Sequence, residues 1–132
     1  MAVNASGATG QLSAFGLGQA AGGGTVLYAS DLPANEIGFF VMSASTTPAT
    51  AAPFSVATLC LGAPQFRWLD SLGLSLDDGT YGIELSETGL PIPSGVIAPG
   101  ESWHFQWFHR DTDMATGQPS ANSTSAVTIL FL

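Results

Sequence analysis

Turn-forming residues divide this sequence into short apolar segments, and that pattern restricts the fold more than any other feature. The chain has 16 glycines and 8 prolines among 132 residues. These residues supply the positive or fixed φ angles that tight turns need. The clearest breaks are Gly22–Gly24, Asp31–Pro33, Asp77–Gly79, Pro91–Pro93 and Ala98–Gly100. Short apolar runs between such breaks are typical of strands and not of helices.

Ten runs are predicted to be strands: Gln11–Phe15, Thr25–Ser30, Ile37–Ser43, Phe54–Leu61, Phe66–Leu69, Leu72–Leu76, Tyr81–Leu85, Gly95–Ala98, Ser102–Arg110 and Ser125–Leu132. Many short strands with regular turns predict an antiparallel β-sandwich, jelly-roll-like, in a single domain over residues 1–132. Residues 1–8 are expected to be flexible. Polar composition predicts loops at 44–53 and 111–124, and loops are common places for binding sites.

The segment Glu101–Asp111 concentrates the reactive residue types of the chain. It contains Trp103, Phe105, Trp107 and Phe108, together with both histidines. Alternate side chains of a strand point to opposite faces. One face is therefore predicted to carry Trp103, Phe105, Trp107 and His109, and the other His104, Gln106, Phe108 and Arg110. One of these two faces is expected to belong to the core.

Charge and hydropathy exclude several classes of partner. The chain has no lysine, and its formal net charge is −8. Nucleic-acid binding depends on clustered Lys and Arg, so nucleic acid is an unsuitable partner. No segment reaches the roughly 18 apolar residues of a membrane span, so membrane insertion is not expected. The single cysteine, Cys60, is predicted to be a small core residue of a strand.

A resemblance extends over nearly the whole chain. The pieces that carry it are Ala29–Phe40, Leu59–Arg67, Pro99–Gln106, His109–Asp111 and Ser120–Thr124, in that order. This order resembles an uncharacterised C-terminal β domain of large secreted proteins of planctomycetes and some other bacteria. The resemblance implies a secreted module at the cell surface or outside the cell, and it implies no activity. Trp107 departs from the family pattern, in which a smaller residue is expected.

Aromatic and cationic residues are the candidate ligand-binding groups. Trp68, Trp103 and Trp107 could each offer a flat ring on which a sugar stacks. Arg67 and Arg110 are the only cations of the chain. We expect them to form buried ion pairs with Asp70, Glu101 or Asp111, because guanidinium groups pair with carboxylates in bidentate geometry. The alternative is a pocket for an anionic ligand.

Metal binding and catalysis receive little support from the residue pattern. His104 and His109 are five residues apart, so a regular strand directs them to opposite faces and away from a shared copper or zinc ion. Asp111 and Asp113 resemble part of a calcium loop, but the later bidentate acid of an EF-hand is missing. Glu84 and Glu87 form the one acid pair that could be compared with a glycosidase.

These observations predict a non-catalytic extracellular accessory module that binds a ligand, with polysaccharide preferred. The alternative is a structural or attachment domain that contacts a cell-surface protein, its parent protein or copies of itself as a homo-oligomer. A small copper protein is the second alternative. The exposure of the tryptophans separates the first two hypotheses, because buried indole rings cannot stack on a sugar.

Overall fold

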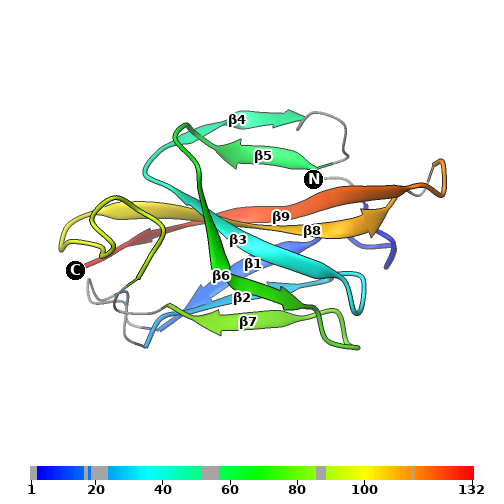
Figure 1. Ribbon diagram of the computed structural model, residues 1–132, viewed down its shortest axis with the longest axis horizontal. Helices are drawn as coiled ribbons and strands as arrows, with labels where there is room; N and C mark the ends of the chain where they lie inside the picture. Colours follow the sequence, from blue (N-terminus) through cyan, green and yellow to red (C-terminus); the bar gives the residue numbers. More distant parts are fainter. Residues whose placement is uncertain (1–2, 17, 19–23, 52–56, 86–88, 114) are drawn as a thin grey trace.

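The computed structural model consists of strands joined by turns and loops (Figure 1). It describes residues 3–16, 18, 24–51, 57–85, 89–113 and 115–132. The part of the chain that it describes holds no helix, and therefore none long and apolar enough to cross a membrane. The strands are β1 Gln11–Phe15, β2 Val26–Ser30, β3 Ile37–Ser43, β4 Thr46–Ala51, β5 Thr58–Leu61, β6 Phe66–Leu74, β7 Tyr81–Glu84, β8 Ser102–Thr112 and β9 Pro119–Leu130.

Three antiparallel sheets form, which confirms the predicted all-β, sandwich-like architecture. The four-stranded sheet has the order β6-β3-β8-β9, and the three-stranded sheet has the order β1-β2-β7. A separate hairpin pairs β4 with β5. We call the face of the four-stranded sheet that carries Phe40, Phe105 and Trp107 its inner face, and the opposite one its outer face. In Figure 1 the β4–β5 hairpin lies apart from the layer that contains β1, β2 and β7.

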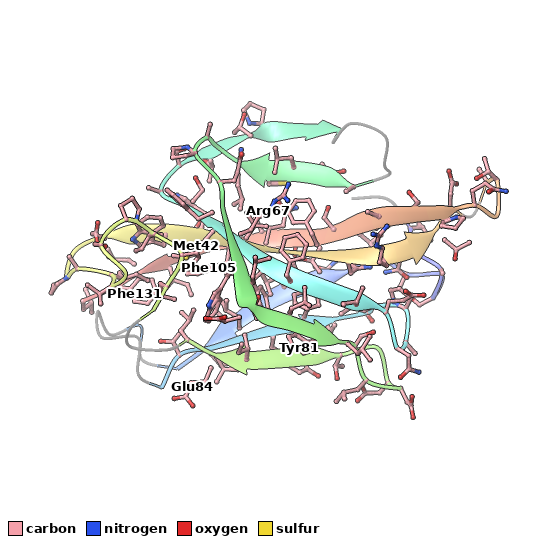
Figure 2. All side chains as sticks on the ribbon, in the orientation of Figure 1. Met42, Arg67, Tyr81, Glu84, Phe105 and Phe131 are labelled. Carbon is pink, nitrogen blue, oxygen red and sulfur yellow. The ribbon has the colours of Figure 1, made fainter. Side chains whose placement is uncertain are left out.

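The core lies between the two larger sheets. Leu27 and Ala29 of β2 are fully buried, as are Phe40 of β3 and Phe105 and Trp107 of β8. Figure 2 shows Met42, Phe105 and Phe131 among the side chains between the layers. The alternation predicted for residues 103–110 is confirmed, since Trp103, Phe105, Trp107 and His109 are all buried on the inner face.

Two glycines make room for the largest rings of this core. Gly38 of β3 lies opposite Gly73 of β6. A Cβ atom at Gly38 would collide with the Trp107 indole, and one at Gly73 would come within 2.5 Å of the Tyr81 hydroxyl. The two rings stack over this glycine pair, with centroids 4.6 Å apart and planes 26° apart. The absence of two side chains on neighbouring strands therefore fixes where Trp107 and Tyr81 pack.

A bulge joins the predicted strands Phe66–Leu69 and Leu72–Leu76 into the single strand β6. The register with β3 shifts between Gly38 and Phe40. At this point Ser71 replaces a ladder partner, because its hydroxyl accepts a hydrogen bond from the Phe40 N–H at 2.8 Å and donates one to the Trp68 carbonyl at 2.5 Å. Between the paired positions β6 has four residues, 69–72, where β3 has only Phe39, and this irregularity accounts for the apparent gap in the sequence pattern.

The structure corrects several sequence-based boundaries. The predicted loop at 44–53 contains the strand β4 over Thr46–Ala51, and residues 52–53 lie outside the described residues. Most of the predicted loop at 111–124 is also strand, because β8 extends to Thr112 and β9 begins at Pro119, and Asp111 pairs with Ser120. Residues 95–98 form no strand, and Leu90, Ile92 and Ile97 of this region instead bury their side chains in the core. Residues 54–56 of the predicted strand Phe54–Leu61 lie outside the described residues.

The structure also differs from the expectation of a flexible N-terminus. Asn4 is fully buried, and its amide donates a 2.6 Å hydrogen bond to the Asp31 carbonyl. The backbone N–H of Ala5 donates to the Asp111 carboxylate at 2.9 Å. Residues 4 and 5 are therefore attached to the sandwich, and residues 1–2 lie outside the described residues.

Candidate functional site

All three tryptophans are buried, and this burial removes them as candidate rings for stacking on a sugar. Trp68 is 5% exposed, Trp103 is 7% exposed and Trp107 is fully buried. Trp107 packs between Phe40 and Tyr81, with its ring centroid 4.8 Å from that of Phe40. The reason is the alternation of side chains along a strand, which places each tryptophan at an inward position of β6 or β8. None of the three can stack on a sugar in this structure.

The two histidines lie on opposite faces of β8. His104, opposite Ser43, has its Nδ1 atom 2.7 Å from the hydroxyl of Thr128. His109, opposite Gly38, is 4% exposed, and its Nδ1 lies 2.8 Å from the Arg110 carbonyl. A carbonyl only accepts hydrogen bonds, so Nδ1 of His109 bears the proton, and its buried Nε2 has no hydrogen-bond partner in the described structure. The pair does not converge on a common ion.

Burial determines the charge of His109. Loss of hydration lowers the pKa of His109 below its usual range. The hydrogen bond to the Arg110 carbonyl and the charges of Asp111 and Glu36 raise this pKa, and they offset only part of the effect of burial. The imidazole is therefore held as a neutral core group.

The two aspartates considered for calcium accept hydrogen bonds from protein groups. Asp111 is 5% exposed, and its two carboxylate oxygens accept hydrogen bonds from the Ala5 N–H and from the Asn122 amide at 3.1 Å. Asp113 accepts from the Ala115 N–H at 2.9 Å and so closes the turn between β8 and β9. Within the described ranges, no group of three or more His, Cys, Asp or Glu side chains could hold a metal ion.

Arg67 and Arg110 are exposed, so the prediction of buried ion pairs is wrong. Neither guanidinium group forms a salt bridge with any residue that the structure describes, and Asp111 is occupied by Ala5 and Asn122. The alternation of side chains along a strand again gives the reason. Arg67 pairs with Val41, which is next to the inward Phe40, and Arg110 is next to the inward His109, so both arginines face outward. Both cations of the chain therefore lie on the outer face of the four-stranded sheet.

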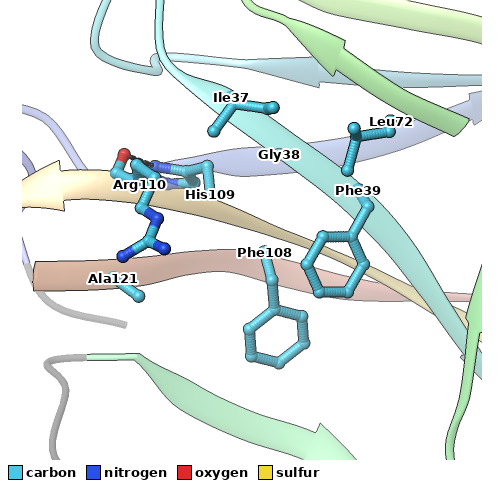
Figure 3. A pocket seen from close by; sticks show the side chains of 8 residues that line it. All are labelled: Ile37, Gly38, Phe39, Leu72, Phe108, His109, Arg110 and Ala121. Atoms are coloured by element: carbon cyan, nitrogen blue, oxygen red, sulfur yellow. Dashed lines mark hydrogen bonds between the residues drawn. The ribbon is translucent and has the colours of Figure 1, made fainter. Parts of the chain in front are cut away.

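An apolar hollow of about 360 Å³ lies on this outer face (Figure 3). We call it the outer hollow. Phe39 of β3 and Phe108 of β8 are directly opposite in the ladder and line the hollow side by side. In Figure 3 Arg110 lies on one side of these rings and Leu72 on the other. The hollow thus offers apolar contact with a positive charge at one edge.

Two further hollows adjoin this face. One of about 320 Å³ shares Phe39 and Phe108 and reaches Arg67, beneath the β4–β5 hairpin. The other, which we call the acidic hollow, follows the end of β6 and is lined by Leu74, Leu76, Asp77 and Asp78, with Asn35 and Ser75. In it, Asp77 accepts a 2.9 Å hydrogen bond from the Asn35 amide, and Asp78 accepts from the Thr80 hydroxyl at 2.6 Å.

The edge beside the outer hollow is apolar and open to solvent. We define the leucine edge as Ile37, Leu72, Leu74 and Leu76, whose side chains are between 40% and 60% exposed. Ile37 and Leu74 face each other in the β3–β6 ladder. Contiguous exposed apolar residues of this kind mark interaction sites more often than isolated ones do.

Sequence reasoning missed Phe39 and the leucine edge, although a signal was present. Phe39 and Phe40 are consecutive, as are Trp107 and Phe108. Neighbours on a strand point to opposite faces, so one ring of each pair must face outward. The pairing of Phe39 with Phe108 across the sheet could not be read from the sequence, because it depends on the register between β3 and β8.

The structure is an all-β, sandwich-like protein with an apolar hollow and an exposed apolar edge on one sheet face. Apolar side chains and guanidinium groups on this face could contact a partner. Cys60, predicted to be a core residue, is half-buried in β5. Comparison of the chain with protein-family models, with curated proteins and with solved structures found no match.

Proposed function

We propose that this protein is a non-catalytic attachment module that binds another protein surface through the outer face of its four-stranded sheet. The observation that carries this proposal is the leucine edge beside the outer hollow. Fully burying a leucine or isoleucine side chain contributes about 1.5–3 kcal/mol, so four such residues could supply much of the free energy of a stable contact. The burial of all three tryptophans favours attachment over sugar stacking.

Polysaccharide binding is the second candidate function. It is now supported by two phenylalanine rings in place of the tryptophans. Phe39 and Phe108 are half-buried rings that line the outer hollow and the neighbouring hollow, next to Gln65 and Arg67. Aromatic rings beside hydrogen-bonding side chains could hold a sugar. The mainly apolar lining of the outer hollow suits a protein partner better.

We also propose, following the resemblance of the sequence, that the module acts outside the cell or at its surface and that its sheets form a jelly-roll-like variant. The acidic net charge suits such a module, because like charges keep an exposed domain soluble.

The test is retention of the domain on the cell-envelope fraction of the organism that encodes it. A fluorescent-protein fusion of the whole chain is expected to bind the envelope, and Leu72→Ser with Leu74→Ser is expected to abolish binding. The matched control is Leu130→Ser with Leu132→Ser, which removes two exposed leucines outside the leucine edge.

Digestion of the envelope identifies the kind of partner. Protease treatment should release the fusion if the partner is a protein. Release only by polysaccharide-degrading enzymes would contradict the attachment proposal and support the second candidate. Equal binding by both double variants would contradict the role of the leucine edge.

A further inference from the structure

The outer face carries two features of opposite charge at the two ends of one apolar strip. Arg110 lies at the edge of the outer hollow, and Asp77 and Asp78 line the acidic hollow. The leucine edge lies between them: Leu72 lines the first hollow, while Leu74 and Leu76 line the second. A surface with an apolar middle, a cation at one end and acids at the other is complementary to itself when turned by half a rotation.

We infer that the occupant of this face is a second copy of the same chain, in a dimer with two-fold symmetry. This inference rests on the proposed attachment function and specifies its partner. The axis passes near the middle of the leucine edge, between Ile37 and Leu76. Leu76 of one copy then lies against Ile37 of the other, and Arg110 of each copy enters the acidic hollow of its partner.

Charge on the rest of the molecule makes this pairing specific. The net charge of −8 opposes any association of two copies. Arg110 is exposed and has no salt bridge within the described residues, so it is available to a partner. Two Arg110–Asp contacts would form per dimer, at the same interface that covers the leucine edge. Charge complementarity of this kind fixes the orientation of a complex more than it adds affinity.

Asp77 is the better of the two acids to change in a test. Asp78 closes the turn after β6, because its carboxylate accepts hydrogen bonds from both the N–H and the hydroxyl of Thr80. Asp77 is exposed and accepts one hydrogen bond, from the exposed Asn35. A substitution of Asp77 therefore changes the charge of the acidic hollow and leaves the turn intact.

The experiment measures mass in solution by sedimentation equilibrium over a wide range of protein concentration. The wild-type chain is expected to reach twice its 13.5 kDa mass. Arg110→Glu and Asp77→Arg should each weaken the dimer by about tenfold or more, since each variant places like charges together at both contacts. Arg67→Glu is the matched control, because it reverses the other exposed arginine outside the proposed interface.

Mixing the two charge variants gives the decisive result. In a dimer of one Arg110→Glu chain and one Asp77→Arg chain, both contacts again join opposite charges, so the mixture should dimerise while each variant alone does not. A mixture that stays monomeric would overturn the inferred geometry. A wild-type chain that is monomeric at every concentration would overturn the dimer.

The outcome for the dimer is separable from that for attachment. If the wild type is monomeric but its envelope retention still requires Leu72 and Leu74, self-pairing fails and attachment to another protein stands. If it is monomeric and is not retained, both fail. Larger masses that grow with concentration would indicate an open chain of copies and would also overturn the closed dimer.

Discussion

Gly38 is the residue on which the position of Trp107 depends. The indole occupies the space that any side chain at Gly38 would need, and Tyr81 uses the matching space above Gly73. Because protein cores are close-packed, neither ring can move aside without disturbing Phe40, which contacts both. At this scale a missing Cβ atom determines the packing of the largest side chain in the core.

Gly38→Ala should therefore destabilise the protein by about 1–3 kcal/mol, the range for forcing extra volume into a packed core. Urea unfolding followed by circular dichroism measures this free energy. The matched control is Gly82→Ala in β7, where the nearest atom to a new Cβ is Tyr28 Cδ2 at 3.4 Å. We expect a change of less than about 0.5 kcal/mol there, and an equal loss in both variants would contradict the account.

His109 should make stability depend on pH. The folded state lowers the pKa of His109 by burial, so the unfolded chain binds a proton more readily. The stabilisation is fully present above the unfolded pKa of about 6.5 and is lost as the pH falls toward the lower pKa of the folded state. His109→Gln removes this component, because glutamine does not titrate.

The measurement compares the free energy of unfolding of the wild type and His109→Gln from about pH 8 to about pH 5. The advantage of the wild type over the variant should shrink as the pH falls. A difference that stays constant would show that the neutral imidazole contributes nothing to this pH dependence.

Among the elements, the β4–β5 hairpin is attached to the outer face by one side chain above all. The Gln106 amide oxygen accepts from the Cys60 N–H at 3.1 Å, and its nitrogen donates to the Thr58 and Thr124 carbonyls at 2.7 and 2.8 Å. Ser123 adds a hydroxyl that accepts from the Thr58 N–H. Gln106 is fully buried, and so is its bond to the Thr124 carbonyl, while its bonds to Cys60 and Thr58 are partly buried.

Gln106→Met should loosen this hairpin at a cost of about 1–3 kcal/mol, because buried backbone groups lose their partners. Hydrogen exchange should accelerate at residues 58–61 and stay unchanged at Phe40 and Met42. Gln65→Met is the matched control, since Gln65 is exposed and makes one bond, to the Leu61 carbonyl. Uniform acceleration throughout the chain would show that the amide supports the whole fold instead.

The alternation of side chains along the strands predicted the facing of more residues than residue chemistry did. Alternation alone predicted that Trp103, Phe105, Trp107 and His109 share one face, and it also predicted the separation of the histidines. Expectations about Trp68 and Arg67 failed because they were taken from residue chemistry, while the pleat places the tryptophan inward and the arginine outward. The β4 strand was missed because Thr46–Ala51 has little apolar character and forms a strand through its pairing with β5.

At the scale of the whole molecule, the candidate site arises from three strands that are distant in sequence. Ile37 and Phe39 come from β3, Leu72 from β6 and Phe108 from β8, and only the sheet order brings them together. Net charge could be read from composition, but the gathering of both cations on one face could not. Because both cations lie on the outer face, that face differs in charge from the rest of this acidic protein.

The burial of the three tryptophans has a consequence for observing this protein. Indole emission lies at shorter wavelength in an apolar environment, and the ring nitrogens of Trp103 and Trp107 have no hydrogen-bond partner in the described structure. Tyr81, stacked on Trp107, is close enough to transfer its excitation to that ring. The core therefore has its own optical reporter, blue-shifted and shielded from soluble quenchers while the sheets are packed, and it needs no added label.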